Sequence, residues 1–233
     1  ISFSAQMHSL IALDTQHHRL TESITWADNR ASKYAELINK EHQGSDIYQR
    51  TGTPIHPMSP LSKIFWMKHE QSDIYKQTAM FADIKTYIFY QLFEKYVIDY
   101  SMASATGMFN LEKLDWDKEA LELLGITEAQ LPQLVPTTHI LKGMKKRYAT
   151  LMGIDENTPI IVGASDGVLS NLGVNSYKKG EVAVTIGTSG AIRTVINKPR
   201  TDYKGRIFCY VLDEDHYVIG GPVNNGGVVL RWL

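Results

Sequence analysis

The stretch "VTIGTSGAI" at residues 184–192 joins two alternating runs of β-branched residues through four small ones, residues 187–190. The alternation on either side predicts two β-strands, and the glycines predict a tight turn between them. Such a turn can be an ordinary hairpin. It can also hold an anion, because unhindered backbone N–H groups and two hydroxyls converge where larger side chains would block the approach. The rest of the chain has to distinguish these interpretations.

The segments around this turn predict a sheet that begins late in the chain. "PIIVGASDGVLSNLGV" (159–174) has the pattern of a buried strand, a turn and a helix, and further strands are expected at 206–213 and 216–223. We place a boundary in the "YKKG" turn at 177–180. Residues 1–176 are therefore expected to form one mixed α/β domain, and residues 177–233 the start of a second.

The first part of the chain carries several helix signals. A strand, a turn and a strand are expected over 1–30, followed by a helix over 29–42 with Asp28 as its cap. Ser59 and Pro60 predict another helix start, with apolar residues from Leu61 to Met67 on its buried side. The remaining helix expectations are a segment 72–96 restarted by the cap Asp83, a helix ended by Gly125, and short helices within 127–135 and 143–153.

Composition limits the classes of partner. The 233 residues are 43% hydrophobic and carry a formal net charge of -1, so the chain can bury a core and lacks the basic excess typical of proteins that bind nucleic acid or anionic membranes. A small-molecule partner is the expectation. A single cysteine, Cys209, excludes an intrachain disulfide, and the sequence contains neither a membrane span nor a secretory leader, which favours a cytoplasmic protein.

At both ends the sequence breaks off within a predicted secondary-structure element. The chain opens on the alternating strand pattern "ISFSAQMH" without an initiator methionine and closes on "NNGGVVLRWL", the start of a helix. We expect the sequence to be an internal piece of a longer protein. It contains neither the P-loop pattern G-x-x-x-x-G-K-[ST] nor G-x-G-x-x-G after a strand, so a phosphate site here has to use the hairpin turn.

Asp166 is the leading candidate for acid–base chemistry. It follows an apolar strand and precedes a short helix, which suits an ordinary helix cap. The same position, at the carboxyl end of a strand, suits a base that accepts a proton from a substrate hydroxyl. The small-residue turn comes about twenty residues later, so a base and a phosphate cradle lie on successive elements, as phosphoryl transfer requires.

Two further segments supply groups for a polyhydroxylated ligand. "SAQMHS" ends a predicted strand with Gln6 and His8 on one face, and "TWADNR" ends another with Trp26, Asp28 and Arg30. Each residue also has an ordinary structural interpretation, as a core histidine, a core tryptophan or a surface ion pair. Spacing of the zinc type is absent from the sequence.

Taken together, the ordered motifs resemble the FGGY carbohydrate kinases, and within them the bacterial gluconokinase branch. The segments that carry the resemblance over the whole chain are "SAQMH", "TWADNR", "GTPIHPM", "DYSMASATGMFN", "GASDGVLSNLGVN", "TIGTSGA" and "GGPVNNGG". The resemblance implies an α/β fold of the actin-like, ribonuclease H-like ATPase class, with sugar and ATP meeting between two domains. It also implies that this sequence lacks the family's first phosphate hairpin at the N-terminal side and most of the C-terminal domain.

The resemblance also implies roles for individual residues. Asp166 matches the catalytic base, acting on the terminal hydroxyl of gluconate to give 6-phosphogluconate. ATP contacts match Gly187, Thr188, Ser189, Gly227 and Arg231. Substrate positions match Gln6, Met7, His8, Trp26, Arg30, Met58 and Gly167. His8 and Arg30 are, on chemistry alone, the candidates to bind the substrate carboxylate. Mg²⁺ is expected to arrive with ATP, so we assign it no protein ligand.

Two other functions stay open. The first is an FGGY kinase for xylulose or another pentulose or polyol, because acceptor choice depends on few side chains. The second, from another class, is a non-catalytic actin-like ATP-binding protein, since a fold does not determine a function. A homodimer is compatible with the sequence and is not specified by it.

Overall fold

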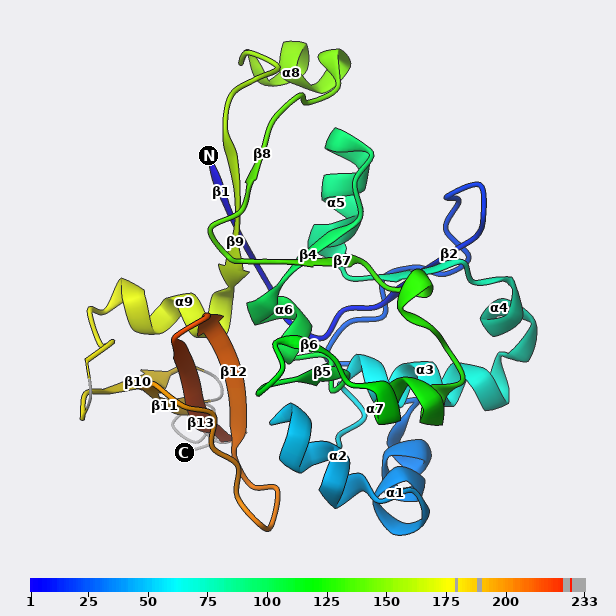
Figure 1. The fold of residues 1–233 in the computed structure, drawn as a ribbon, viewed down its shortest axis with the longest axis vertical. Coiled ribbons are helices and arrows are strands. Elements are labelled where there is room, and N and C mark those ends of the chain that lie inside the picture. Colours follow the sequence, from blue (N-terminus) through cyan, green and yellow to red (C-terminus); the bar gives the residue numbers. More distant parts are fainter. Residues whose placement is uncertain (179, 188–189, 224–226, 228–233) are drawn as a thin grey trace.

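The computed structural model describes residues 1–178, 180–187, 190–223 and 227, and it shows a mixed α/β architecture (Figure 1). The helices are α1 (Ser32–Glu41), α2 (Gly44–Thr51), α3 (Pro60–Glu70), α4 (Ser72–Gln77), α5 (Ile84–Phe93), α6 (Tyr100–Ser104), α7 (Lys118–Leu124), the 3₁₀ turn η1 (Glu128–Gln130), α8 (Lys146–Met152) and α9 (Asp166–Gly173). The strands are β1 (Ser2–Ala5), β2 (Ile11–Leu13), β3 (Met80–Ala82), β4 (Val97–Asp99), β5 (Phe109–Asn110), β6 (Asp115–Trp116), β7 (Gln133–Val135), β8 (Ile140–Leu141), β9 (Ile160–Ser165), β10 (Val182–Ile186), β11 (Gly190–Ile196), β12 (Phe208–Asp213) and β13 (His216–Val223).

The sheet that positions the candidate base has the order β1-β9-β8. Strands β1 and β9 run parallel although more than 150 residues separate them, with Ala5 opposite Ser165 at their carboxyl ends. Strand β4 pairs in parallel with β7 and lies next to β9. The carboxyl ends of β1 and β9 therefore meet at one edge, which is where α/β sheets commonly bind ligands.

The second sheet is antiparallel, with the order β10-β11-β13-β12. The two alternating runs on either side of the small-residue turn are strands β10 and β11, as predicted, and the strands expected at 206–213 and 216–223 are present as β12 and β13. Strand β12 packs on α6, and the Val211 amide donates to Oγ of Ser104 over 2.9 Å. Helix α9 packs between the two sheets, against β9, β11 and β12 (Figure 1).

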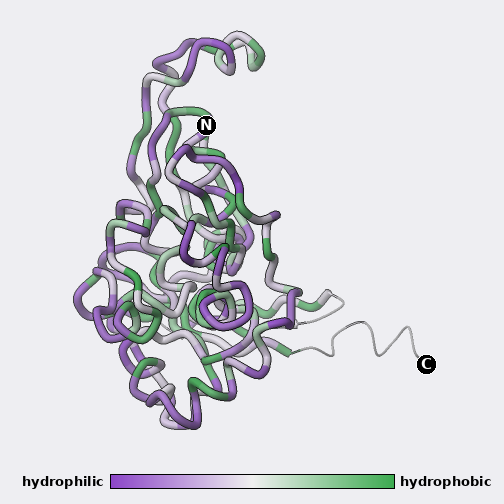
Figure 2. Tube along the Cα trace, turned by 90° about the vertical axis from the view of Figure 1, so that its right-hand side faces the viewer, coloured by the Kyte–Doolittle hydropathy of each residue, from purple (hydrophilic) through white to green (hydrophobic). Residues whose placement is uncertain are grey.

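The apolar residues gather in the interior, with polar segments outside them (Figure 2). The largest buried cluster joins α1, α3 and α7 to residues of β12 and β13, including Val211 and Tyr217. The segment carrying α8 projects from this body (Figure 1, Figure 2). Among the described residues, none of the helices has both the length and the apolar character required to span a bilayer.

The predicted helix caps at Ser59, Asp83 and Gly125 are confirmed. Oγ of Ser59 accepts from the Ser62 amide with Pro60 in the first turn, and the Asp83 carboxylate accepts from the Thr86 amide over 2.9 Å. Gly125 ends α7 in the left-handed conformation, with φ 73°. These caps depend on groups within three or four residues, so local sequence was sufficient to predict them.

Three local predictions were wrong. Asp28 does not cap a helix, because α1 begins only at Ser32 and the Asp28 carboxylate instead pairs with Arg30. The helix expected over 127–135 is the 3₁₀ turn η1 followed by β7, since Pro132 lacks the amide that a longer helix would use. The strand expected before residue 30 is reduced to an isolated bridge between Leu10 and Ile24. The domain division between residues 176 and 177 stays a prediction.

Candidate active site

Asp166 lies where β9 passes directly into α9. The helix cap is Ser165, whose Oγ accepts from the Val168 amide, so Asp166 itself is the first residue of the helix. One oxygen of its carboxylate accepts from the Gly167 amide over 2.7 Å, and the side chain is exposed. Because Ser165 does the capping, the Asp166 carboxylate keeps acceptor capacity for a ligand hydroxyl.

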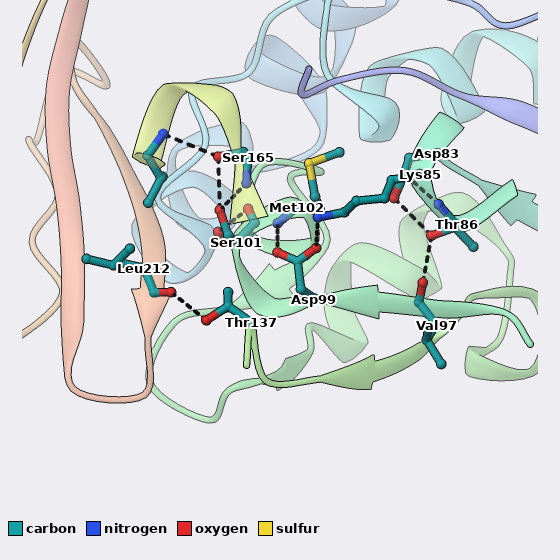
Figure 3. A network of polar contacts seen from close by, with 12 residues as sticks. Asp83, Lys85, Thr86, Val97, Asp99, Ser101, Met102, Thr137, Ser165 and Leu212 are labelled. Carbon is teal, nitrogen blue, oxygen red and sulfur yellow. Dashed lines mark hydrogen bonds and ion pairs between the residues drawn. The ribbon is translucent and has the colours of Figure 1, made fainter. Parts of the chain in front are cut away.

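A buried polar network supports this strand-to-helix junction (Figure 3). The Ser101 hydroxyl donates to Oγ of Ser165 over 2.9 Å, and the Ser165 amide donates back to Oγ of Ser101 over 3.2 Å. Ser101 is itself held because Asp99 caps α6 and forms a fully buried ion pair with Lys85, at 2.5 Å. Packing from β4 and α6 thus orients the first turn of α9, and with it Asp166.

The segment after β1 arrives at the same place. Since Ala5 pairs with Ser165, the next residues, Gln6, Met7 and His8, leave the sheet beside Asp166. Gln6 is exposed and Met7 is half-buried. A methyl group on Gly167 would lie 2.7 Å from Cε of Met7, so these two predicted substrate positions touch. The parallel pairing brings together residues that are far apart in sequence.

His8 is buried and uncharged at neutral pH. Its Nδ1 lies 2.9 Å from the carbonyl oxygen of Ala105, and its side chain is only 8% exposed. Burial, followed by the positive charge of Lys63, lowers its pKa from 6.5 to about 4. Nδ1–H therefore donates to Ala105 and Nε2 stays an acceptor, which suits a sugar hydroxyl and does not supply a positive charge for a carboxylate.

The segment "TWADNR" contributes to a hollow whose lining does not include Asp166. Trp26 is 57% exposed and so is not the core tryptophan that its apolar ring would allow. The Arg30 guanidinium donates to both oxygens of the Asp28 carboxylate through Nε and Nη2, and it lies 4.6 Å from the ring centroid of Trp66. Arg30 lines a hollow of about 390 Å³ together with Asp28 and Trp66, and the lining of that hollow does not include Met7, His8 or Asp166.

Lys63 connects these two regions. Its buried Nζ donates to the carbonyl oxygens of His8, Ile24 and Thr25 over 2.5 to 3.2 Å. Burial lowers its pKa to about 8. Met58 lies half-buried in the loop before α3, where its amide donates to Nδ1 of His56. His56 is close enough to His8 to contribute to the lowered pKa of His8, so the Met58 loop borders the same cluster.

The predicted phosphate turn is described only in part. Gly187 is exposed at the end of β10, and its carbonyl oxygen accepts from the Gly227 amide over 2.6 Å. A Cβ on Gly227 would lie 3.0 Å from that oxygen, so a side chain there would press on the turn. The two predicted ATP segments thus meet through their glycines. Thr188, Ser189 and Arg231 lie outside the described residues.

Three residues near the site were not recognised from motifs. Arg193 follows the turn on β11, Lys63 lies in α3, and Ser101 lies in the first turn of α6. The sequence offered weak indications of two of them. Arg193 alternates with Ala191 and Val195, which are buried, so its side chain is on the same face of β11. Lys63 interrupts a run of apolar residues in a helix. In the part of the chain that the structure describes, no group of three or more His, Cys, Asp or Glu side chains gathers as a metal site.

Comparison with known proteins bears on the whole chain. The model for "FGGY family of carbohydrate kinases, N-terminal domain" matches residues 1–173. A gluconokinase of Bacillus subtilis is 62% identical over all 233 residues, and the chain spans 45% of that relative's length. Two solved structures from Lactobacillus acidophilus, described as a gluconate kinase and as a ligand-bound xylulose kinase, are each 44% identical with TM-score 0.97. Each is matched over 100% of this chain and 47% of its own.

Proposed function

The chain belongs to the FGGY family of carbohydrate kinases, and we propose that the full-length protein transfers a phosphoryl group from ATP to the terminal hydroxyl of gluconate, forming 6-phosphogluconate. The observation that carries this proposal is the 62% identity to the Bacillus gluconokinase, which extends over every segment of the chain, including those around Asp166. The meeting of Gln6, Met7, His8 and Asp166 at one sheet edge supports it.

Asp166 acts as the general base in this proposal. Its exposed carboxylate accepts the proton of the acceptor hydroxyl while that oxygen attacks the terminal phosphorus of ATP and the bond to the leaving ADP oxygen breaks. The Gly167 amide and the cap at Ser165 hold the carboxylate in one orientation. Positioning of the reacting groups contributes much of the rate enhancement in phosphoryl transfer. The junction of β9 and α9 therefore contributes to catalysis by fixing the position of the Asp166 carboxylate.

The other groups bind and orient. Nε2 of His8 accepts a hydrogen bond from a sugar hydroxyl, and Gln6, Met7, Met58 and Gly167 border the substrate. Gly187 approaches the ATP phosphates through its backbone amide, and Gly227 supports this turn because its own amide donates to the Gly187 carbonyl oxygen. The family resemblance assigns Gly227, Thr188, Ser189 and Arg231 to ATP binding as well. Trp26 and Arg30 form an outer border. Mg²⁺ bound to the ATP phosphates would supply positive charge that stabilises the transferred group, and no residue of this chain is assigned to it.

A second acceptor has specific support. One of the two Lactobacillus acidophilus structures is described as a xylulose kinase at the same identity as its gluconate kinase counterpart, which makes a pentulose the alternative substrate. Sugar-independent ATP turnover would instead indicate an actin-like ATP-binding protein, because an assembly protein has no reason to respond to a polyol.

The test is ADP release by the full-length protein with Mg²⁺ and ATP, in the presence of gluconate, xylulose, glycerol or no sugar. We expect turnover with gluconate, and a loss on the order of a thousandfold in Asp166→Asn, because the variant cannot accept the proton. Asp73→Asn is the matched control, since Asp73 is exposed on α4. Turnover without a sugar, or full activity in Asp166→Asn, would contradict the proposal.

A further inference from the structure

A sugar acid brings one charged group, its carboxylate, and binding it requires a cation that is not otherwise occupied. Of the described cations around the site, His8 is neutral at pH 7, and Nζ of Lys63 is spent on three backbone carbonyl groups. Arg30 is engaged by the Asp28 carboxylate. The candidates that chemistry alone suggested for the carboxylate are therefore either uncharged or already paired.

Arg193 differs from these cations in its contacts. It lies on β11 opposite Gly220 of β13, on the same inward face as the buried residues Ala191 and Val195. Its Nη1 donates to Oγ1 of Thr185 over 3.2 Å, while its Nε is buried and has no hydrogen-bond partner in the described part of the chain. A buried N–H of a charged group without a partner is costly, and the cost is recovered when an anion binds.

The structure aims this guanidinium at the proposed substrate site. A methyl group on Gly167 would lie 3.8 Å from Nη2 and 3.9 Å from Nε of Arg193, and 2.7 Å from Cε of Met7. The absence of a side chain at Gly220 lets the arginine stem lie across β13, since a Cβ there would be 3.2 Å from Cγ of Arg193. Arg193 thus borders Met7 and Gly167, two positions assigned to the sugar.

Burial and two neighbouring groups have opposite effects on the pKa of Arg193. Burial lowers the pKa of the Arg193 guanidinium, and the nearby Asp166 carboxylate and Tyr210 hydroxyl oppose that effect. Arginine stays protonated under such conditions. The guanidinium is therefore a permanent, partly desolvated positive charge. Nη1 is used by Thr185, whereas the edge formed by Nε and Nη2 has no hydrogen-bond acceptor in the described part of the chain. Such an edge has the geometry that binds a carboxylate in bidentate fashion.

We propose that Arg193 binds the carboxylate of the acceptor and so makes the site selective for a sugar acid over a neutral polyol of the same length. This inference rests on the proposed function, because it concerns the same acceptor. It also explains why a charged residue shares a sheet face with the buried residues Ala191 and Val195. A site built to pair a buried charge discriminates strongly against a ligand that lacks the partner.

The experiment is a binding cycle with the full-length protein. The ligands are gluconate and its neutral amide, gluconamide, and calorimetry measures both dissociation constants for the unaltered protein, Arg193→Met and Arg193→Lys. We expect a preference for gluconate of about a hundredfold in the unaltered protein, its disappearance in Arg193→Met, and partial retention in Arg193→Lys. Arg147→Met on α8 is the matched control, because Arg147 is exposed and lies on the projecting segment.

The outcomes separate the two proposals. If the unaltered protein neither binds nor phosphorylates gluconate, the proposed function fails. If it does both, and Arg193→Met keeps the hundredfold preference or weakens both ligands equally, the function stands and the role of Arg193 is overturned. Unchanged dissociation constants with a lower kcat would also overturn it, since they would place the guanidinium on the transferred phosphoryl group. Unchanged ATP binding verifies that each variant is folded.

Discussion

His8 shows how its surroundings set the chemistry of a residue. It follows β1 in a left-handed backbone conformation, with φ 68°, a region that histidine tolerates better than most side chains. Its burial and its contact with the carbonyl oxygen of Ala105 leave Nε2 as a fixed acceptor. The residue type was visible in the sequence as a candidate ligand. Its neutrality was not, because it depends on Lys63 and on burial by segments distant in the chain.

The lowered pKa of His8 should make the stability of the protein depend on pH under acidic conditions. The pKa of His8 is about 4 in the folded protein and 6.5 when unfolded, so between these values the unfolded state binds a proton that the folded state does not. The contribution of His8 to stability should therefore be constant above pH 6.5 and fall as the pH decreases toward 4, by about 3 kcal/mol in total. Urea unfolding across this range should show a shallower pH dependence in His8→Gln.

The control is His18→Gln, in a side chain that is 78% exposed. The loss of stability below pH 6.5 that is caused by His8 should remain in this variant. If His8→Gln also follows the unaltered profile, then His8 is not buried in its neutral form.

At the scale of elements, the pairing of β1 with β9 depends on Gly163. This residue has φ 71°, and a Cβ on it would lie 2.0 Å from the carbonyl oxygen of Phe3. It lies beside the irregularity where the register shifts between Ser2 and Ser4. A side chain would separate the two strands whose carboxyl ends form the candidate site. An isolated glycine in a strand pattern indicates such a close approach without saying which strand approaches.

Gly163→Ala should therefore destabilise the protein by several kcal/mol, because the contact is with backbone and the conformation disfavours any side chain. It should also lower the affinity for gluconate, since Gln6, Met7 and His8 would shift from Asp166. Denaturant unfolding and calorimetry measure the two effects. Gly173→Ala at the end of α9 is the matched control, with open space around its Cβ and no positive φ, and should be close to neutral. Equal stability of the two variants would contradict the role of Gly163.

At the scale of the whole molecule, β12 connects the second sheet to the first body. The Cys209 amide donates to the carbonyl oxygen of Gly52, and the Thr137 hydroxyl donates to the carbonyl oxygen of Leu212. Cys209 and Val211 are fully buried, and both belong to the large core cluster. This shared core resists separation of the second sheet from α3, α6 and α7, and it holds Arg193 against α9.

Cys209 provides a direct probe of that docking, because it is the chain's single cysteine. Its side chain has 0% exposure, and burial raises its pKa to about 11. Labelling by a thiol reagent should be at least about a hundredfold slower in native buffer than in concentrated urea, since only opening of β12 exposes the thiolate. Gly52→Ala should accelerate labelling, because its Cβ would lie 2.6 Å from the Cys209 carbonyl oxygen. Native labelling as fast as in urea would show that β12 is not docked.

Features that depend on near neighbours in the chain could be predicted from the amino-acid sequence. The caps at Ser59 and Asp83, the end of α7 at Gly125, and the alternating strands β10 and β11 follow from interactions within a few residues or from side-chain parity. Ordered motifs also predicted the family, which the match over residues 1–173 confirms. Asp28 was misassigned because its competing partner, Arg30, was equally close in sequence.

Folding determines which distant groups meet and in which charge state they are. The pairing of Ala5 with Ser165 places residues 6–8 beside Asp166. The packing of β11 on α9 places Arg193 beside Gly167. Burial then neutralises His8 and leaves Nε of Arg193 without a partner. These properties arise from desolvation and Coulomb interactions between segments more than twenty residues apart, which no local pattern encodes.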